Sequence, residues 1–273
     1  MNVHPFAQRI LDFVFEAGRI SLKYIDNSNA SFKKDQSVLT IADQKISELL
    51  HERLRDLVQT GEHLIIDEED PRVNELLDAA LLDQAQYIWV CDPIDGTRSY
   101  ANRMPQFGIS LGLLKDRRPW MGAVYFPALG ELFFADGTEA WFAGNAFSAI
   151  EKRQPVKPVH EPITGRSMLL YDNDFLKKHR PKNIQVLISG TSVVDLTWPA
   201  IGRGCGAVFG SSVWDFAGAW PVFEAAGLQL HQIKTGAALQ QIDTRLFHKN
   251  WKLRDYYLLC RHDQFKTIRS TFS

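Results

Sequence analysis

The chain has 273 residues, of which 45% are hydrophobic, and its formal net charge at pH 7 is -1. This length and composition predict a globular protein with one large domain or two modest ones. The near-neutral charge argues against a nucleic acid or an anionic membrane surface as the main partner. The three cysteines are widely spaced, which predicts no disulfide framework and favours a reducing, cytoplasmic location. We expect neither a signal peptide nor a transmembrane helix.

The N-terminal part of the chain predicts two amphipathic helices and a short strand. Apolar residues recur at helical spacing over residues 6–25. Thr40 and Asp43 match a capping box, and the apolar pattern that follows predicts a second helix over residues 41–58. Residues 63–66 predict a short strand, which leads into a run of four acidic residues.

An apolar run, residues 87–91, leads into the hexapeptide Asp92-Pro93-Ile94-Asp95-Gly96-Thr97. This order predicts a strand, a sharp charged turn and then the start of a helix. The pattern afterwards becomes rich in strands, and Asp136-Gly137 is a strong signal for a hairpin between the last two of them. The predicted strands cover residues 107–114, 122–126, 131–135 and 140–143.

Residues 151–166 contain several prolines and mixed charges, which predicts a surface connection between two halves. Strands and helices alternate after this segment, and such alternation indicates an α/β layer. We therefore divide the chain into an N-terminal α+β half, residues 1–150, and a C-terminal α/β half, residues 151–273. The predicted elements of the second half are strands at 167–171, 184–188 and 206–209, and helices at 173–180, 191–202 and 214–226.

The hexapeptide combines two kinds of binding group. A hard divalent cation prefers carboxylate oxygens, which Asp92 and Asp95 supply. A phosphate binds backbone N–H groups at the start of a helix, which Gly96-Thr97 can open. The hexapeptide therefore predicts metal-assisted phosphate chemistry. An ordinary turn is the simpler alternative, because Asp, Pro and Gly are all common turn residues.

Three more acids, Asp43, Glu68 and Asp215, lie at the edges of apolar elements, where several elements can direct carboxylates at one point. Buried carboxylates are unfavourable unless they are paired or bound to cations. Each acid also has a simpler explanation. Asp43 fits the third position of the capping box, Glu68 fits a solvated acidic loop, and Asp215 fits a first-turn acid favoured by the helix dipole.

Five segments, in this order along the chain, resemble the inositol monophosphatase superfamily of metal-dependent, lithium-sensitive phosphatases. The resemblance runs from about Ala7 to Gly227, and the hexapeptide is its most specific part. It implies an α/β fold, the layered αβαβα sandwich of the sugar-phosphatase type, with the active site between the two halves. The five segments are Lys33–Asp43, Ile65–Glu69, Trp89–Thr97, Gly190–Ser192 and Trp214–Gly218.

The resemblance implies a site for two or three magnesium ions. Asp92 would bridge two ions, Glu68 and the carbonyl of Ile94 would bind the first, and Asp95 with Asp215 would bind the second. Such a cluster lowers the pKa of a bound water and neutralises charge on the phosphoryl oxygens.

The resemblance also assigns roles toward the water and the substrate. Asp43, Glu68 and Thr97 would orient and activate a water that attacks the phosphorus in line, and which of them accepts the proton stays open. A second helix N-terminus and a loop lysine would add contacts, although the former also fits an ordinary N-cap and the latter a solvated side chain. The expected substrate or phosphate contacts are Gly96, Thr97, Gly190, Thr191, Ser192 and Lys33.

The positions that would recognise the substrate depart from the family pattern. Asp67 stands where many relatives have glycine, and it either adds negative charge near the metals or points to solvent. Residues 208–213 lack an acid, and residues 187–189 lack an arginine, that inositol-phosphate relatives carry. Pro221 should bend the last predicted helix. Inositol monophosphate is therefore one candidate substrate, beside histidinol phosphate, which Arg98 suggests, and a 3′-phosphonucleotide.

The leading interpretation is a magnesium-dependent phosphomonoesterase that hydrolyses a small phosphate monoester. Two alternatives stay open: a catalytically weak regulator that binds metal or a phosphorylated ligand, and a structural or interaction protein. The acids together with Thr97 favour the enzyme, because binding alone would not require all of them. Relatives commonly form homodimers, so we expect a homodimer.

Overall fold

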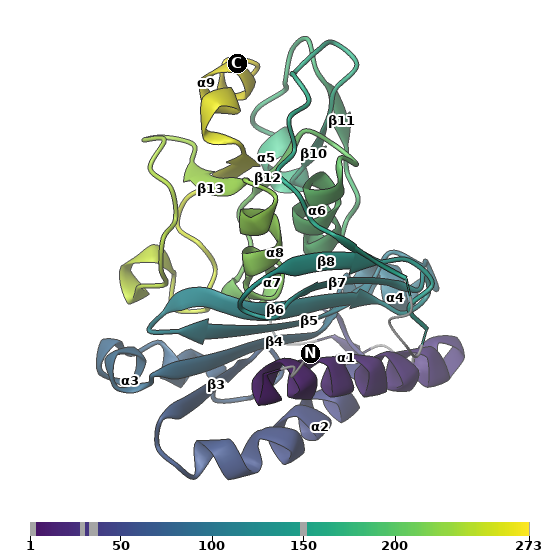
Figure 1. The fold of residues 1–273 in the computed structure, drawn as a ribbon, viewed down its shortest axis with the longest axis vertical. Coiled ribbons are helices and arrows are strands. Elements are labelled where there is room, and N and C mark those ends of the chain that lie inside the picture. The colour runs from purple at the N-terminus through teal and green to yellow at the C-terminus, as the bar shows by residue number, and fades with distance from the viewer. Residues whose placement is uncertain (1–3, 28–30, 33–37, 148–151, 273) are drawn as a thin grey trace.

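Helices and sheets alternate in the order αβαβα through the computed structural model (Figure 1), which confirms the layered fold implied by the family resemblance. The structure describes residues 4–27, 31–32, 38–147 and 152–272. Helices α6 to α8 lie between a seven-stranded and a five-stranded sheet, and α5 and α9 lie on the outer face of the second. The helices are α1 (Pro5–Tyr24), α2 (Ile41–Val58), α3 (Ala79–Gln84), α4 (Thr97–Ala101), α5 (Asn173–Leu176), α6 (Ser192–Thr197), α7 (Val213–Ala217), α8 (Trp220–Ala225) and α9 (Phe265–Arg269).

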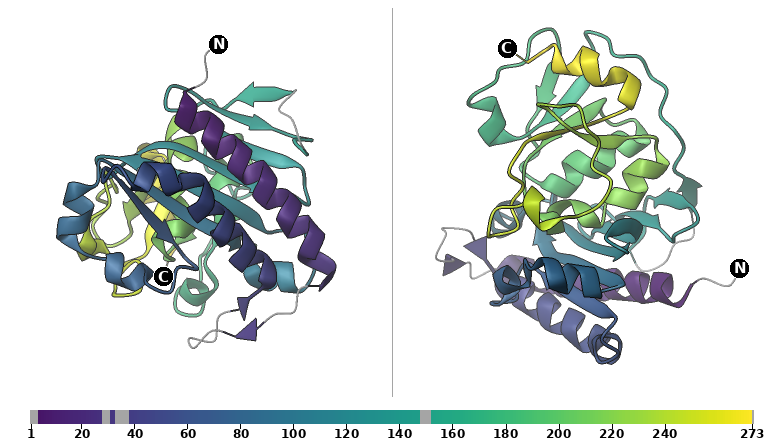
Figure 2. Two further views of the ribbon diagram at one scale, coloured as in Figure 1. Left: turned by 90° about the horizontal axis from the view of Figure 1, so that it is seen from below. Right: turned by 90° about the vertical axis from the view of Figure 1, so that its left-hand side faces the viewer.

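The two long helices, α1 and α2, lie side by side across the outer face of the first sheet (Figure 2). The predicted capping box begins α2, since the Thr40 N–H donates to Asp43 Oδ2 at 2.8 Å. Both helices bury one apolar stripe, as their periodicity predicts. Within the described part of the chain, none of the helices combines the length and hydrophobicity needed to span a membrane.

The seven-stranded sheet runs in the order β3-β4-β5-β6-β7-β8-β9. β3 and β4 are parallel, and every later pair is antiparallel, as predicted for the middle of the chain. β9 extends this sheet beyond residue 150, the end of the predicted N-terminal half. The strands are β3 (His63–Asp67), β4 (Tyr87–Asp95), β5 (Gly108–Lys115), β6 (Arg118–Phe126), β7 (Glu131–Ala135), β8 (Ala140–Ala143) and β9 (Arg153–Pro155).

The hexapeptide is not the sharp turn that we expected. β4 continues through it to Asp95, and its register against β5 shifts between Asp92 and Asp95. Pro93 has no N–H to donate to the ladder, which accounts for an irregularity at this point. The chain turns one residue later, at Gly96, which has a φ of 81°, and α4 then begins at Thr97 as predicted.

The second sheet runs in the order β11-β10-β12-β14-β13, with β10 parallel to both of its neighbours. Its inner face packs on the middle helices and its outer face on α5 and α9. The helix predicted near residues 173–180 is limited to the short α5. The strands are β10 (Met168–Tyr171), β11 (Gln185–Leu187), β12 (Gly206–Phe209), β13 (Gln229–Gln232) and β14 (Tyr257–Cys260), and a separate antiparallel pair comprises β1 (Ser31–Phe32) and β2 (Val38–Leu39).

The single helix predicted over residues 214–226 is wrong, because the segment forms two short helices, α7 and α8. Pro221 lies in the first turn of α8, where its missing N–H is not needed, instead of bending a longer helix. α7 approaches the first sheet closely: a Cβ added at Gly112 would lie 2.5 Å from the carbonyl of Ala217. Glycine at this strand position therefore lets the helix that carries Asp215 lie directly on β5.

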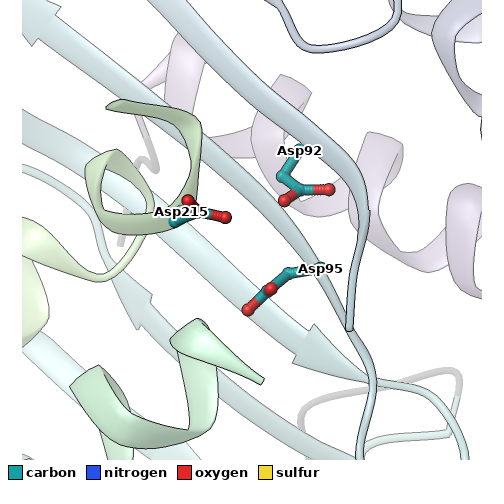
Figure 3. A group of neighbouring side chains, drawn as sticks. All are labelled: Asp92, Asp95 and Asp215. Atoms are coloured by element: carbon teal, nitrogen blue, oxygen red, sulfur yellow. The ribbon is translucent and has the colours of Figure 1, made fainter. Parts of the chain in front are cut away.

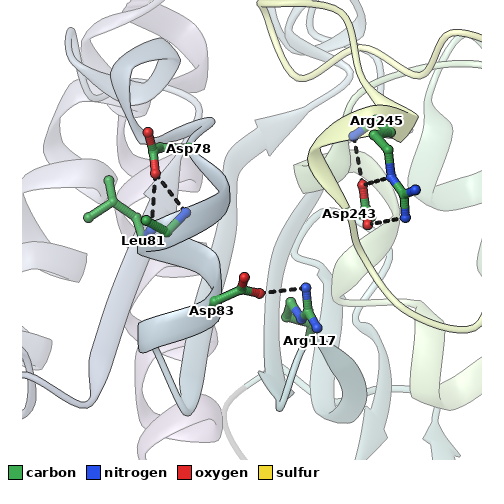
Figure 4. Close-up of polar contacts among 7 residues, drawn as sticks. Asp78, Leu81, Asp83, Arg117, Asp243 and Arg245 are labelled. Carbon is green, nitrogen blue, oxygen red and sulfur yellow. Dashed lines mark hydrogen bonds and ion pairs between the residues drawn. The ribbon is translucent and has the colours of Figure 1, made fainter.

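Charged groups pair on α3 and on the C-terminal segment that lies near it (Figure 4). The Asp78 carboxylate caps α3, and Asp83 of that helix pairs with Arg117 in the β5–β6 turn at 2.7 Å. On the neighbouring C-terminal segment, Arg245 pairs with Asp243 and lowers the pKa of that carboxyl to about 2. Exposed pairs such as these contribute little stability each, so the apolar layers carry most of the fold.

We predict that Gly112→Ala destabilises the protein by about 1–3 kcal/mol, because the new methyl group would overlap backbone atoms that cannot move aside. Urea unfolding followed by circular dichroism measures this change. Gly165→Ala is the matched control, since a Cβ there has no neighbour within 4 Å, and its effect should stay within about 0.5 kcal/mol. Equal effects of the two substitutions would contradict the close contact.

Candidate active site

Three aspartates converge where the first sheet meets the middle helices (Figure 3). Asp92 and Asp95 come from β4, and Asp215 comes from the first turn of α7. Each offers an oxygen atom, and these atoms lie within 4.8 Å of one another. The three residues are only 2%, 6% and 9% exposed, respectively. Residues that are 120 positions apart in the sequence are thus brought into one buried group.

Strand alternation directs Asp92 toward this group. Trp89 and Cys91 belong to the core cluster beneath α1 and α2, whereas Val90 belongs to the cluster around the middle helices. Successive side chains of a strand point to opposite faces, so Asp92 points to the same face as Val90, where α7 lies. The register shift that follows lets Asp95 reach the same face three residues later.

The local structure at the start of α7 holds Asp215. The Ser212 N–H donates to Asp215 Oδ2 at 2.7 Å, so the simpler explanation of a first-turn acid also holds. A second contact ties α7 to the sheet, because the Ser110 hydroxyl donates to the carbonyl of Trp214 at 3.2 Å. We did not anticipate the role of Ser110. The sequence feature that could have revealed this role is a serine inside an apolar strand, because a buried hydroxyl needs a hydrogen-bond partner.

The electrostatics of the group are unfavourable for three free carboxylates. Burial is the largest cause that raises the pKa of each, and the neighbouring acids, Glu68 among them, raise it further. The pKa of Asp95 rises to about 7, although hydrogen bonds from backbone N–H groups, that of Val193 first, oppose the rise. The pKa values of Asp92 and Asp215 are also raised well above their ordinary value.

These residues fit a hard divalent cation. Asp92 Oδ1 is buried and has no hydrogen-bond partner among the described atoms, which is unfavourable for a carboxylate oxygen unless a cation binds it. Carboxylate oxygens are the preferred ligands of Mg2+ and Ca2+. A bound cation would also favour the ionised form of all three groups and so oppose the effect of burial.

Glu68 and Asp43 lie at the margin of this group. The Glu68 N–H donates to the carbonyl of Cys91 at 3.2 Å, which places Glu68 beside Asp92. The charges of both acids raise the pKa of Asp92, although neither belongs to the closest group of oxygens. Asp43 is buried and completes the capping box of α2, so its structural explanation holds beside any catalytic one.

Two of the predicted contacts, Gly96 and Ser192, direct their backbone N–H groups at Asp95. Val193 donates its backbone N–H to Asp95 Oδ2, so the start of α6 faces that carboxylate. We did not predict this contact, because no sequence pattern links the two segments. Gly190 itself is exposed.

Glycine is required at position 96. Besides its positive φ, a Cβ there would lie 2.6 Å from the Thr191 hydroxyl. The next residue, Thr97, donates its hydroxyl to the carbonyl of Ile94 at 3.0 Å. The structure thus places Ile94, Gly96, Thr97 and Thr191 together, whereas the predicted contact Lys33 lies outside the described residues.

The thiol beside Asp92 is not a nucleophile. Cys91 is fully buried, and burial raises the pKa of its thiol well above the ordinary value. Cys205 and Cys260 are also free thiols, as the spacing of the cysteines predicted.

Asp67 adopts neither of the two positions that we considered. Its side chain is fully buried, and it points toward α2, away from both solvent and the three aspartates. The acid that replaces a glycine of the family is therefore a partner of the helix layer.

An αβαβα sandwich with buried acids between its first sheet and middle helices is typical of metal-dependent phosphate-ester hydrolases. The model of the inositol monophosphatase family matches residues 3–263, and the chain belongs to this family. Members of the family hydrolyse phosphomonoesters, so this protein is a phosphoric monoester hydrolase.

Individual relatives agree on the family but differ in their substrates. The chain is 26% identical over 208 residues to 3′(2′),5′-bisphosphate nucleotidase CysQ of Salmonella typhimurium, covering 73% of this chain and 78% of that one. It is 27% identical over 243 residues to inositol monophosphatase 1 of Solanum lycopersicum, covering 83% and 84%. The solved structure of a Thermotoga maritima IMPase has a TM-score of 0.74 at 17% identity, covering 96% and 94%.

The raised pKa values predict how stability depends on pH in the metal-free protein. Between about pH 4 and pH 7 the folded protein binds more protons at Asp95 than the unfolded chain does, so this group stabilises the fold at low pH and loses that effect as pH rises. With a chelator present, the unfolding free energy of the parent should fall from pH 5 to pH 8 relative to Asp95→Asn, by more than about 1 kcal/mol.

Urea unfolding of both proteins at the two pH values measures this difference. Added Mg2+ should reduce the fall, because a cation stabilises the charged carboxylates. A parent that gains stability relative to Asp95→Asn as pH rises would contradict the raised pKa.

Proposed function

We propose that this protein is a magnesium-dependent phosphomonoesterase that hydrolyses a small phosphate monoester by in-line attack of water. The observation that carries the proposal is the buried group of Asp92, Asp95 and Asp215, with its raised pKa values and its unpartnered Asp92 oxygen. A structural protein has no use for such a group. A binding-only regulator would not need Glu68, Thr97 and the three aspartates all together.

In this proposal Asp92, Asp95, Asp215, Glu68 and the carbonyl of Ile94 hold two or three magnesium ions. When bound, the ions neutralise charge on the phosphoryl oxygens and lower the pKa of a coordinated water. The chain supplies ligands from three places, β4, the turn after β3 and the start of α7. Because each ligand lies at the end of a packed element, binding requires little rearrangement.

Thr97 is proposed to orient the attacking water. Its hydroxyl proton is already donated to the carbonyl of Ile94, so the oxygen is directed to accept a hydrogen bond. Water that donates to Thr97 would keep a lone pair for the phosphorus. Asp43 and Glu68 are the carboxylates near Asp92 that can accept the other proton.

The contacts to the substrate are proposed to come from the two segments that meet at Asp95. Gly96 brings the chain close to Thr191, and the two helices α4 and α6 start beside each other. The N–H groups of Gly96, Ser192 and Val193 are directed at Asp95, and that of Thr191 donates to Ser189 Oγ. A phosphate would therefore bind the N–H groups that remain at these starts. The proposed contacts are Gly96, Thr97, Gly190, Thr191, Ser192 and Lys33.

An inositol monophosphate-like ester is the first candidate substrate, and histidinol phosphate is an alternative. One observation favours a second alternative, a 3′-phosphonucleotide. The loop before Asp215 lacks an acid, so this loop adds no negative charge that would repel a further anionic group of the substrate. The names of the CysQ relatives, which are 3′(2′),5′-bisphosphate nucleotidases, support the same alternative.

A phosphate-release assay tests the function. The parent should hydrolyse at least one of inositol 1-phosphate, histidinol phosphate and 3′-phosphoadenosine 5′-phosphate, and only with Mg2+. Asp92→Asn should lower the rate by about 100-fold or more, because it removes a carboxylate that is proposed to bind the magnesium ions. Asp174→Asn, an equal change at an exposed acid paired with Lys177, is the control and should keep the parent rate.

Activity without Mg2+ in the presence of a chelator, or parent activity in Asp92→Asn, would overturn the proposed mechanism. Absence of activity on every ester, together with tight Mn2+ binding, would favour the catalytically weak regulator.

We further propose a cytoplasmic homodimer that lithium inhibits, on the basis of the family resemblance. Light scattering should give about twice the chain mass of 31.1 kDa. Millimolar lithium should lower phosphate release, whereas equal sodium should not. A monomeric mass would contradict the homodimer. Equal rates of phosphate release in the two salts would contradict the inhibition by lithium.

A further inference from the structure

A buried acid lies immediately before Glu68. Asp67 ends β3, is fully buried, and accepts hydrogen bonds from two elements. The Ser47 hydroxyl of α2 donates to Asp67 Oδ2, and the Glu69 N–H donates to Asp67 Oδ1 at 3.1 Å. His51 Nε2 lies 3.3 Å from Oδ2. The carboxylate therefore connects the turn after β3 to helix α2.

The partners form one set on one helix. Ser47 and His51 are four residues apart, a spacing that places both on the same face of α2. The hydrogen bond to Asp67 is the largest cause that raises the pKa of His51, so the pair favours the charged imidazole. A buried carboxylate is unfavourable without such partners, and their presence makes this orientation of the turn strongly preferred.

The other face of β3 is the one that faces the middle helices and the three aspartates. Ile65 and Asp67 face the layer of α1 and α2, whereas Ile66 faces the middle helices. Strand alternation continued by one residue directs Glu68 to the face of Ile66. The Glu68 N–H is bound to the carbonyl of Cys91, the neighbour of Asp92. Holding Asp67 on α2 thus holds Glu68 toward the three aspartates.

We propose that Asp67, together with Ser47 and His51, positions Glu68 and thereby sets the cation affinity of the site. This inference rests on the proposed function, in which Glu68 binds a cation. The three residues touch neither cation nor substrate and act through Glu68. Polar partners behind a metal ligand restrict its orientation, and their removal weakens metal binding by about 10–100-fold in known sites.

The test measures binding of Mn2+ to the folded full chain by electron paramagnetic resonance, without any substrate. Asp67→Ala should raise the apparent Kd for Mn2+ by about 10-fold or more, and Ser47→Ala should raise it less. Ser47→Thr keeps the hydroxyl and should restore the parent affinity. Phosphate release at saturating Mg2+ should recover to within about 3-fold of the parent, so that the defect lies in cation affinity and not in turnover.

Asp83→Asn is the matched control, because Asp83 is an exposed acid of α3 that pairs with Arg117 and not with α2. It should keep the parent affinity. Parent affinity for Mn2+ in Asp67→Ala and Ser47→Ala would overturn the positioning role. If Asp67→Ala does not fold, the Mn2+ affinities of Ser47→Ala and Ser47→Thr test the positioning role by themselves.

Glu68→Gln separates this inference from the function on which it rests. If Glu68→Gln binds Mn2+ more weakly than the parent while Asp67→Ala binds it as tightly as the parent, only the positioning role is refuted. Parent affinity in Glu68→Gln refutes the assignment of Glu68 as a ligand, and the positioning role with it.

Discussion

Three carboxylates approach one another in a place that water scarcely reaches, and the rest of the site follows from how their repulsion is relieved. Asp92, Asp95 and Asp215 cannot all be ionised there without a counter-charge, because burial and mutual repulsion both favour the neutral form. Within the protein, hydrogen bonds from backbone N–H groups relieve part of this for Asp95 and Asp215. One oxygen of Asp92 stays without a partner, and it is the atom that a cation would satisfy.

The fold maintains this unfavourable arrangement by close packing around it. The strand that carries two of the acids is paired along both edges, with β3 on one side and β5 on the other. The helix that carries the third lies so near β5 that only glycine fits at position 112. Two further anchors, the Ser110 hydroxyl on α7 and Asp67 on α2, act from opposite sides of the sheet. The packing of the apolar layers thus keeps the three aspartates close together despite their mutual repulsion.

Local patterns predicted much of this structure. The helices over residues 41–58 and 6–25 followed from apolar spacing, and the capping box located the start of α2. The order of the acidic segments indicated the family. The layering and the meeting of Asp215 with β4 depend on contacts between distant segments, which a single sequence does not encode in any local pattern. They came from the resemblance.

The errors have physical causes. Asp, Pro and Gly favour turns locally, yet pairing with β5 kept Asp92 and Asp95 in the strand and placed the turn at Gly96. A continuous apolar pattern hid the break between α7 and α8, which is set by packing on the sheet. Asp67 was misjudged because its partners, Ser47 and His51, lie about twenty residues earlier on another element.

If the three aspartates form a divalent cation site, Mn2+ soaked into crystals of the protein should bind between them. We expect an anomalous difference peak in contact with Asp92, Asp95 and Asp215, and the loss of that peak in Asp92→Asn. A fully soaked crystal with no peak between these residues, or with Mn2+ bound only elsewhere, would contradict it.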